Sequence, residues 1–339
     1  MIDRRQALVG AMAMGVSLAA PAPLWAARIK KPPRLRLGDT VGIVAPASAV
    51  SEREIQTAAF QIEGMGLVPR LGANIRSTDG YLAGSDAERA GDIDAMFGDE
   101  EVRAIFALRG GWGGARLLPL LDWDRIRANP KLLIGYSDVT ALHLAFAARA
   151  GFATIHSPNA SSRWTSESWN SLWRLAFTGE TPVLGGARHE PSSVVPQSRT
   201  IRAGLARGRL LGGNLTVLST LMGTPWLPDF DGAILFLEDV NEAEYRVDRM
   251  LRQLALAGIL ERAGGVVFGT CRSCASDEPD YGGFSLDRLL DDYLGPLDIP
   301  AFVGANVGHI RGQLSLPHGA EVELDAGERT IRLLEPIVS

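Results

Sequence analysis

The stretch Leu132-Leu-Ile-Gly-Tyr-Ser-Asp-Val-Thr-Ala-Leu-His-Leu-Ala-Phe-Ala-Ala-Arg-Ala150 predicts a strand, a sharp turn and a helix in succession. Leu132 to Ile134 is a short apolar run, and Val139 to Ala150 has the apolar spacing of a helix. Strands that alternate with helices in this way form parallel sheets with helices on both faces. Ligands bind such sheets beyond the carboxyl ends of the strands, so we expect the turn around Ser137 at a functional edge.

The same alternation continues on both sides of this stretch. We expect strands at 40–45, 102–108, 233–237 and 265–268, helices at 51–65, 85–97, 245–257 and 286–293, and short β segments near the C-terminus. The rhythm is lost from 161 to 203, where tryptophans precede a Pro/Ser/Gly-rich run. We therefore predict an α/β fold with an N-terminal nucleophile domain over 37–165, an interdomain linker over 166–203 and a C-terminal α/β domain over 204–339.

Length and composition agree with two globular domains. The chain has 339 residues, 46% hydrophobic and 22% charged, which is enough to bury a sizeable core. Its net charge of −5 argues against a nucleic-acid partner, because such proteins carry a basic face for phosphates. Glycine accounts for 38 residues, about 11% against a typical 7%, which indicates a site built from tight loops.

The N-terminus has the pattern of an export signal. Residues 1–26 combine a short charged start, an apolar stretch from Ala7 to Ala20 and a small-residue cleavage region. The paired Arg4 and Arg5 resemble a twin-arginine signal, and an uncleaved anchor is the alternative. Residues 27–36 would form a linker. We expect a periplasmic protein with no stable membrane insertion after cleavage, and its net charge would be −5 − (+1) = −6.

The two cysteines, Cys271 and Cys274, stand in the sequence Cys-Arg-Ser-Cys. A zinc site needs four ligands, and no second cysteine or histidine pair lies nearby. We therefore expect two ordinary thiols, with a local disulfide as the less favoured alternative, and neither a metal nor another cofactor.

The most informative chemistry lies at Gly135-Tyr-Ser-Asp-Val-Thr140. A serine between a strand and a helix can present its hydroxyl at a nucleophile elbow, although Ser137 or Asp138 could instead cap the helix. A serine nucleophile needs a base. Among the histidines, His156 and His309 are comparable candidates. His143 is expected to be packed in a helix, and His189 and His318 to lie at the surface.

The third member of such a site is a carboxylate that orients the imidazole. Glu238 ends the apolar run Ala233-Ile-Leu-Phe-Leu237, where a charged group would emerge at the end of a strand. Asp239, Glu242 and Glu244 follow closely, and local spacing does not choose among the four acids.

Seven short motifs occur in the order seen in the murein L,D-carboxypeptidase family of serine peptidases, which the chain resembles over nearly its whole mature length. They are Arg109-Gly-Gly-Trp-Gly113, Gly135-Tyr-Ser-Asp-Val-Thr140, Gly212-Gly-Asn-Leu215, Gly223-Thr-Pro-Trp226, Leu237-Glu-Asp-Val-Asn-Glu242, Tyr245-Arg-Val-Asp-Arg249 and Gly308-His309. The resemblance implies a class I glutamine amidotransferase-like N-terminal domain and a mixed α/β C-terminal domain of the swivelling type.

This resemblance also implies a catalytic Ser137, Glu238 and His309 in a cleft between the domains. It implies an oxyanion hole formed by the amides of Asp138 and of the glycine loop, for which we choose Gly111, with Gly110 a close competitor.

The implied substrate is a murein tetrapeptide that loses its terminal D-alanine. An arginine suits the free carboxylate. Arg109 is the first candidate, and Arg246 and Arg249 are alternatives. We add Trp112 and Asn214 as expected substrate contacts, although Trp112 could equally pack within the loop.

Other functions remain open at this point. The family includes microcin-immunity-type enzymes that hydrolyse a different acyl or amide bond, and a periplasmic binding protein would also combine two α/β domains with an export signal. A dinucleotide-binding oxidoreductase is disfavoured, because Arg116 stands where the Gly111-Trp-Gly113 loop would need a later glycine or alanine. We also expect a homodimer, whose interface the sequence does not locate.

Overall fold

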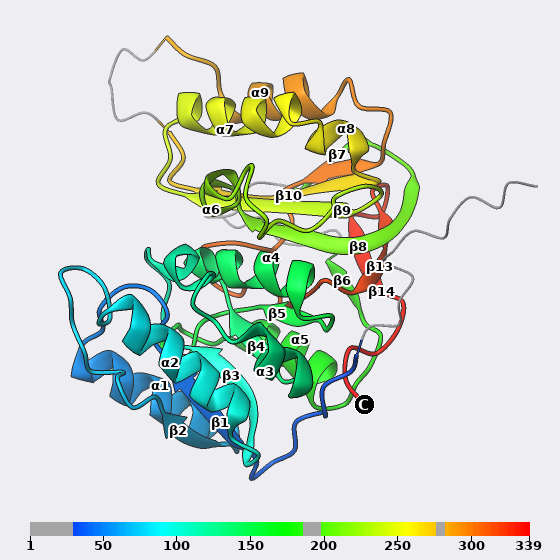
Figure 1. Ribbon diagram of the computed structural model, residues 1–339. Coiled ribbons are helices and arrows are strands. Elements are labelled where there is room, and N and C mark those ends of the chain that lie inside the picture. Colours follow the sequence, from blue (N-terminus) through cyan, green and yellow to red (C-terminus); the bar gives the residue numbers. More distant parts are fainter. Residues whose placement is uncertain (1–29, 186–197, 276–281) are drawn as a thin grey trace, which may run out of the picture.

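The computed structural model describes residues 30–185, 198–275 and 282–339, which form two sheets with flanking helices (Figure 1). The expected α/β fold, with a largely parallel N-terminal sheet and a mixed C-terminal part, is confirmed. The export signal at 1–26 and His189 lie outside the described residues. No helix in the described ranges combines the length and apolar character needed to cross a membrane.

The first sheet is parallel except at one edge. Its order is β12 (Leu316–His318), β5 (Thr154–His156), β4 (Leu132–Gly135), β3 (Val102–Ala107), β1 (Thr40–Val44) and β2 (Val68–Leu71), with β12 antiparallel to β5. Side chains of β3 alternate between two cores. One core includes α1 (Glu52–Gly64) and α5 (Ser166–Ala176), and the other α2 (Asp86–Gly98), α3 (Trp123–Ala128) and α4 (Thr140–Arg149).

The second sheet has a parallel centre and antiparallel edges. Its order is β6 (Val183–Gly185), β14 (Thr330–Leu333), β13 (Glu321–Asp325), β8 (Leu205–Asn214), β9 (Ile234–Val240), β10 (Gly265–Arg272), β11 (Ala301–Val303) and β7 (Arg199–Arg202), with β8 to β11 parallel. One face is covered by α6 (Leu215–Thr220), α7 (Glu244–Leu256), α8 (Ile259–Arg262) and α9 (Leu286–Leu294) (Figure 1).

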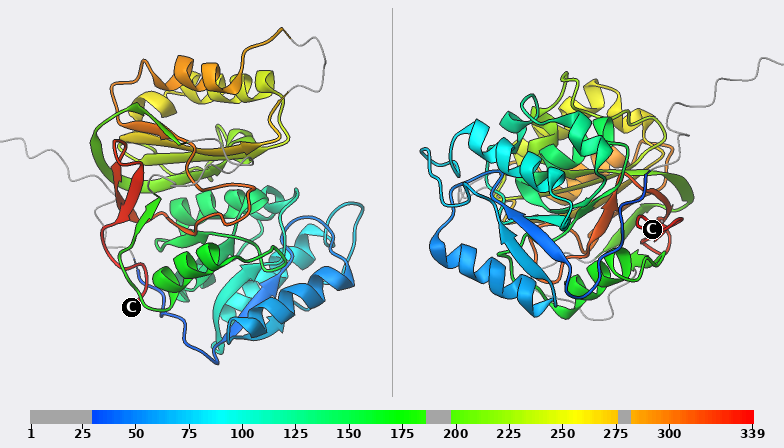
Figure 2. Two further views of the ribbon diagram at one scale, coloured as in Figure 1. Left: turned by 180° about the vertical axis from the view of Figure 1, so that it is seen from behind. Right: turned by 60° about the horizontal axis from the view of Figure 1, so that its bottom comes forward.

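Helix α4 lies between the two sheets and contacts both β5 and β8 (Figure 2). Gly213 allows this close packing against α4, and Gly212 allows the close approach of β8 and β9. A Cβ on Gly213 would lie 2.4 Å from Oγ1 of Thr140, and one on Gly212 would lie 1.8 Å from the carbonyl oxygen of Phe236. Gly212 and Gly213 also adopt positive φ, 139° and 129° respectively, which other residues rarely adopt.

Three parts of the chain differ from the sequence expectation. The segment 166–203, expected as a linker, contains α5, β6 and β7, because its tryptophans belong to an amphipathic helix whose Leu172 and Leu175 are buried. The ten-residue strand β8 was not expected, because its glycines interrupt the pattern of apolar residues that indicates a strand. The lead-in 30–36, expected as a linker, buries Leu35 and bonds to the C-terminal Ser339.

The cysteines form a disulfide, so the expectation of two ordinary thiols was wrong. Arg272 ends β10, and Ser273 turns the chain with φ 56°. This turn brings the Cα atoms of Cys271 and Cys274 to 5.3 Å, a separation within the usual range for a disulfide.

The glycine at 212 provides a test of the sheet packing. We expect Gly212→Ala to lower unfolding free energy by about 2–4 kcal/mol, because a side chain there clashes and strains the backbone. The matched control is Gly91→Ala in α2, where a Cβ meets nothing within 4 Å. The control should gain about 0.5–1 kcal/mol. Thermal unfolding followed by circular dichroism measures both, and equal midpoints for the two variants would contradict the packing described.

Candidate active site

Ser137 lies in a tight turn between β4 and α4. Gly135 ends β4, Tyr136 is extended, and Ser137 adopts φ 65° in a short 3₁₀ turn that leads into α4. A non-glycine residue in this left-handed region costs of order 1–3 kcal/mol and persists where its surroundings enforce it. The turn presents the hydroxyl beyond the strand end, as a nucleophile elbow does.

Three side chains from the two sheets form one hydrogen-bonded row. Nε2 of His309 lies 3.0 Å from Oγ of Ser137, and its Nδ1 lies 2.7 Å from Oε2 of Glu238. Glu238 comes from β9 and is fully buried, whereas the His309 side chain, in the loop after β11, is 15% exposed. The structure therefore joins Ser137 to His309 rather than to His156, and His309 to Glu238 rather than to the acids that follow it.

Gly308 allows His309 to approach Glu238. Its φ is 114°, and a Cβ there would lie 2.8 Å from Oε2 of Glu238 and 2.7 Å from Oγ1 of Thr270. Any side chain at this position would push the loop away from β9 and β10. The turn before the histidine is thus one place where the glycine excess has a definite purpose.

Electrostatics favour the protonated form of His309. Burial opposes protonation, but the charge and hydrogen bond of Glu238 outweigh burial, with help from Asp239, so the pKa of His309 is raised above its usual value. Arg272 acts in the opposite direction. An imidazole that gains a proton from a serine hydroxyl passes through this protonated form, which the site therefore stabilises.

The loop from Arg109 to Gly114 packs against the turn that carries Ser137. A Cβ on Gly110 would lie 2.9 Å from Cβ of Ser137 and 3.4 Å from the amide nitrogen of Asp138. Gly111, with φ 115°, packs instead against Ser48. The α-carbon that packs against Ser137 is that of Gly110, while Gly111 as an oxyanion donor stays a prediction.

The carboxylate of Asp138 fastens this loop. Its Oδ2 accepts a hydrogen bond from the amide of Gly114 at 2.7 Å, and the buried Arg89 of α2 donates to the carbonyl of Gly113 at 3.0 Å. Burial raises the pKa of Asp138 to about 6, although the amides of Gly114 and Gly113 and the charge of Arg89 oppose that rise. This role of the Asp138 side chain was not predicted from the sequence, and a buried arginine on α2 carries no sequence signal.

The residues expected to contact substrate differ in exposure. Arg109 pairs with Glu54 at 3.2 Å, and its side chain is 40% exposed. Trp112 is 38% exposed, and its amide donates to Oγ of Ser48 at 3.3 Å. Asn214 is buried, so the structure places only the first two at the surface of the site region.

Asn214 instead belongs to a network around Asp239. Its side chain caps α6 through the amide of Val217 at 3.1 Å and donates to Oδ1 of Asp239 at 2.9 Å. Burial and the charge of Glu238 raise the pKa of Asp239 to about 6. Asn214 is paired with Glu238 in the β8–β9 register, so it supports the acid from the neighbouring strand.

Three other histidines form a buried cluster behind the site. His143 is packed in α4, as expected, and its ring lies 5.4 Å from that of His318 and 6.1 Å from that of His156. The expectation that His318 lies at the surface was wrong, because β12 pairs with β5 and carries it into the core. Burial lowers the pKa of all three imidazoles, that of His143 to about 4.

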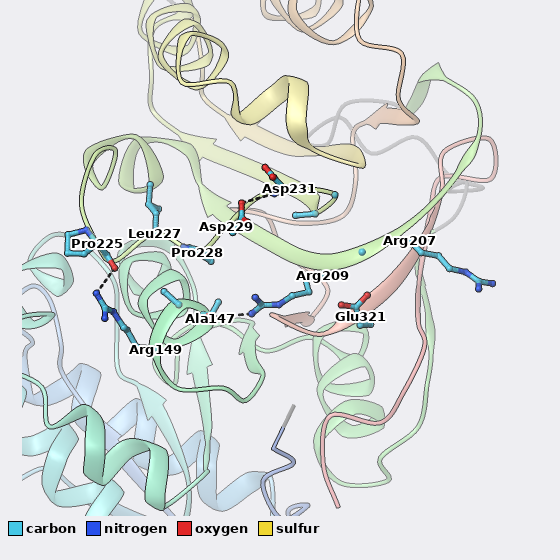
Figure 3. Close-up of a pocket in the computed structure, with 14 residues that line it drawn as sticks. Ala147, Arg149, Arg207, Arg209, Pro225, Leu227, Pro228, Asp229, Asp231 and Glu321 are labelled. Atoms are coloured by element: carbon cyan, nitrogen blue, oxygen red, sulfur yellow. Dashed lines mark hydrogen bonds between the residues drawn. The ribbon is translucent and has the colours of Figure 1, made fainter. Parts of the chain in front are cut away.

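A pocket of about 640 Å³ lies away from this row of side chains (Figure 3). Its lining includes Arg149, at the opposite end of α4 from Ser137, and Arg209 of β8, which donates to the carbonyls of Ala147 and Gly319. The pocket contains no member of the row. Within the described ranges, no cluster of three or more His, Cys, Asp or Glu side chains is arranged to hold a metal ion.

A hydroxyl, an imidazole and a carboxylate in one row, on an α/β fold with an elbow at the hydroxyl, define the arrangement of serine hydrolases. Comparisons with known proteins identify the family. The family models described as LD-carboxypeptidase N-terminal domain and LD-carboxypeptidase C-terminal domain match residues 41–157 and 207–324. The chain belongs to the LD-carboxypeptidase family of peptidases.

Individual relatives cover nearly the whole chain. A probable murein peptide carboxypeptidase of Bacillus subtilis is 36% identical over 88% of this chain and 93% of its own. The crystal structure of muramoyltetrapeptide carboxypeptidase from Oxalobacter formigenes has a TM-score of 0.74, 29% identity and coverage of 87% and 97%. Microcin C7 self immunity protein MccF in its apo state has a TM-score of 0.81 at 24% identity, covering 91% and 100%, and so shares the fold.

The raised pKa of His309 is directly measurable. We expect its imidazole to titrate above the usual pKa in NMR spectra of histidine-labelled protein, and Glu238→Gln to lower that pKa because the neutral amide removes the stabilising charge. The matched control is Glu242→Gln, since Glu242 pairs with Arg246 at 3.6 Å rather than with the histidine. His309→Gln assigns the resonance. An unchanged pKa in Glu238→Gln would show that Glu238 does not stabilise the imidazolium.

Proposed function

We propose that this protein is a serine-type L,D-carboxypeptidase that releases the terminal D-alanine from murein tetrapeptides. The observation that carries the proposal is the hydrogen-bonded row of Ser137, His309 and Glu238. The names of relatives that act on murein peptides, such as the Oxalobacter formigenes enzyme, support the substrate class. Family membership favours a peptidase over the alternative of a non-catalytic binding protein.

In this mechanism Ser137 attacks the carbonyl carbon at the L-centre that precedes D-alanine, and His309 accepts the hydroxyl proton. Glu238 holds the imidazole in place and stabilises its charge. His309 then gives the proton to the leaving amine, and the same base activates a water that hydrolyses the acyl-enzyme. The amides of Asp138 and Gly111, or of Gly110 in its place, would stabilise the oxyanion.

The nucleophile is tested with a murein tetrapeptide and mass spectrometry of released D-alanine. We expect Ser137→Ala to reduce kcat by about 10⁴-fold or more, because the acyl-enzyme cannot form. The control Ser166→Ala changes an exposed serine at the start of α5 and should retain full activity. Equal release by Ser137→Ala and the unmodified enzyme would refute the assignment. A chain that cleaves only a microcin-like acyl adenylate would establish the microcin-immunity alternative.

We also propose that the chain is exported by the twin-arginine route and acts in the periplasm. Its support is the pattern of residues 1–26. A reporter fused after the first 40 residues should reach the periplasm, and changing both Arg4 and Arg5 to lysine should retain it in the cytoplasm. A reporter that stays in the cytoplasm with either sequence would reject export. The homodimer likewise stays a prediction, which light scattering of the mature protein measures.

A further inference from the structure

A carboxypeptidase must hold a free carboxylate next to the scissile bond, and the arginines expected for this task are engaged or remote from the row. Arg109 pairs with Glu54 of α1, and Arg246 pairs with Glu242. Arg249 is an exposed residue of α7, a helix on the outer face of the second sheet (Figure 1). A different cation, Arg272, lies at the end of β10, next to the strand that carries Glu238.

We propose that the guanidinium of Arg272 binds a substrate carboxylate beside the Ser137–His309 pair. This inference rests on the proposed carboxypeptidase function and deepens it. Arg272 ends β10, its side chain is exposed, and it makes no ion pair with any residue that the structure describes. An exposed guanidinium at a strand end can be reached by an incoming anion.

Strand geometry places Arg272 on the side of the catalytic row. Thr270 lies two residues earlier on β10, and a Cβ on Gly308 would lie 2.7 Å from its Oγ1 and 2.8 Å from Oε2 of Glu238. Thr270 therefore borders the space where the histidine loop meets the acid. The β9–β10 ladder is irregular between Phe268 and Cys271, and its register resumes with Arg272 opposite Val240. Side chains two residues apart on a strand leave from the same face, so Val240 and its neighbour Arg272 lie on the face of Glu238, nearer the strand end.

The electrostatic field agrees with this placement. After burial and the acids Glu238 and Asp239, the charge of Arg272 is the next influence on the pKa of His309, which it lowers. Burial and the charge of Glu238 raise the pKa of Tyr136, and the charge of Arg272 opposes that rise. The ring centre of Tyr136 lies 4.8 Å from that of His309. Coulomb interactions weaken with distance and with solvent screening. These contributions agree with the position of Arg272 that the strand register gives.

The backbone that carries Arg272 is held on both sides. Its carbonyl accepts a hydrogen bond from the amide of Asn241 at 2.8 Å, and the β9–β10 register pairs it with Val240. The disulfide between Cys271 and Cys274 closes the turn around it. An arginine on a fixed backbone loses less conformational freedom when its planar fork binds a carboxylate.

A murein tetrapeptide offers two carboxylates near the scissile bond. One is the terminal carboxylate of D-alanine, and the other is the side-chain carboxylate of a diaminopimelate residue at the L-centre. Both would match the bidentate geometry of a guanidinium. The exposed end of β10 can receive either, and altered substrates tell the two apart.

The test compares wild type, Arg272→Lys and Arg272→Gln, with Arg332→Gln of β14 as an exposed arginine control. On the diaminopimelate tetrapeptide we expect Arg272→Gln to raise KM about 10- to 100-fold, as loss of a charged hydrogen-bond pair implies. Its kcat should change much less, Arg272→Lys should be intermediate, and Arg332→Gln should match wild type. Equal KM values for wild type and Arg272→Gln would overturn the proposal.

Two modified peptides identify the carboxylate. If the terminal carboxylate is bound, wild type and Arg272→Gln should become equal on a peptide ending in D-alaninamide. If the side-chain carboxylate is bound, they should become equal when lysine replaces diaminopimelate. A KM defect of Arg272→Gln that persists on a peptide lacking both carboxylates would overturn the proposal, since it would report a structural effect.

Binding separates this proposal from the proposed function. Calorimetry with Ser137→Ala and Ser137→Ala/Arg272→Gln measures tetrapeptide affinity without turnover. A 10-fold or greater loss in the double variant supports the Arg272 site even if the wild type releases no D-alanine, a result that would refute the function alone. Equal affinities, or no binding by Ser137→Ala, would reject the site. Unchanged thermal midpoints confirm that the variants are folded.

Discussion

The contact between Thr140 and the Gly213–Asn214 pair fixes the two sheets relative to each other, and the proposed site depends on it. Oγ1 of Thr140 accepts a hydrogen bond from the amide of Asn214 at 2.9 Å, and the missing side chain of Gly213 lets the two elements meet. Thr140 follows Ser137 by three residues, and Asn214 pairs in register with Glu238. These few contacts thus set the distance between Ser137 and Glu238, which His309 spans.

The second constraint is that buried carboxylates need hydrogen-bond partners. Asp239 accepts from Asn214, from the amide and hydroxyl of Thr216 and from the amide of Val240, all at 2.9 Å. Glu238 is bonded instead to the imidazole of His309. A buried carboxylate is stable only when it is paired. Glu238 therefore favours a protonated imidazole. The proposed acyl-transfer mechanism passes through the same protonated form.

Sequence patterns predicted the local structure and missed the features that depend on contacts between distant parts of the chain. The strand, turn and helix around Ser137 follow from apolar spacing and were located correctly, whereas β8 was missed because close packing requires glycines within it. Spacing could not choose between His156 and His309, nor among Glu238 and its neighbouring acids, because hydrogen bonds across two sheets decide both. Family resemblance selected the residues that the structure joins. The burial of His318 and the capping role of Asn214 come from pairings that no local pattern records.

The position of the disulfide is informative about its purpose. In the chain-entropy account, a disulfide stabilises a protein more as the loop it closes becomes longer, and Cys271 and Cys274 are separated by only three positions. Its expected global contribution is therefore at the small end, which agrees with the proposed export in the folded state, before oxidation. At the proposed periplasmic location, oxidation would act locally, by fixing the turn that carries Arg272. Export, disulfide and carboxylate recognition are in this way mutually consistent.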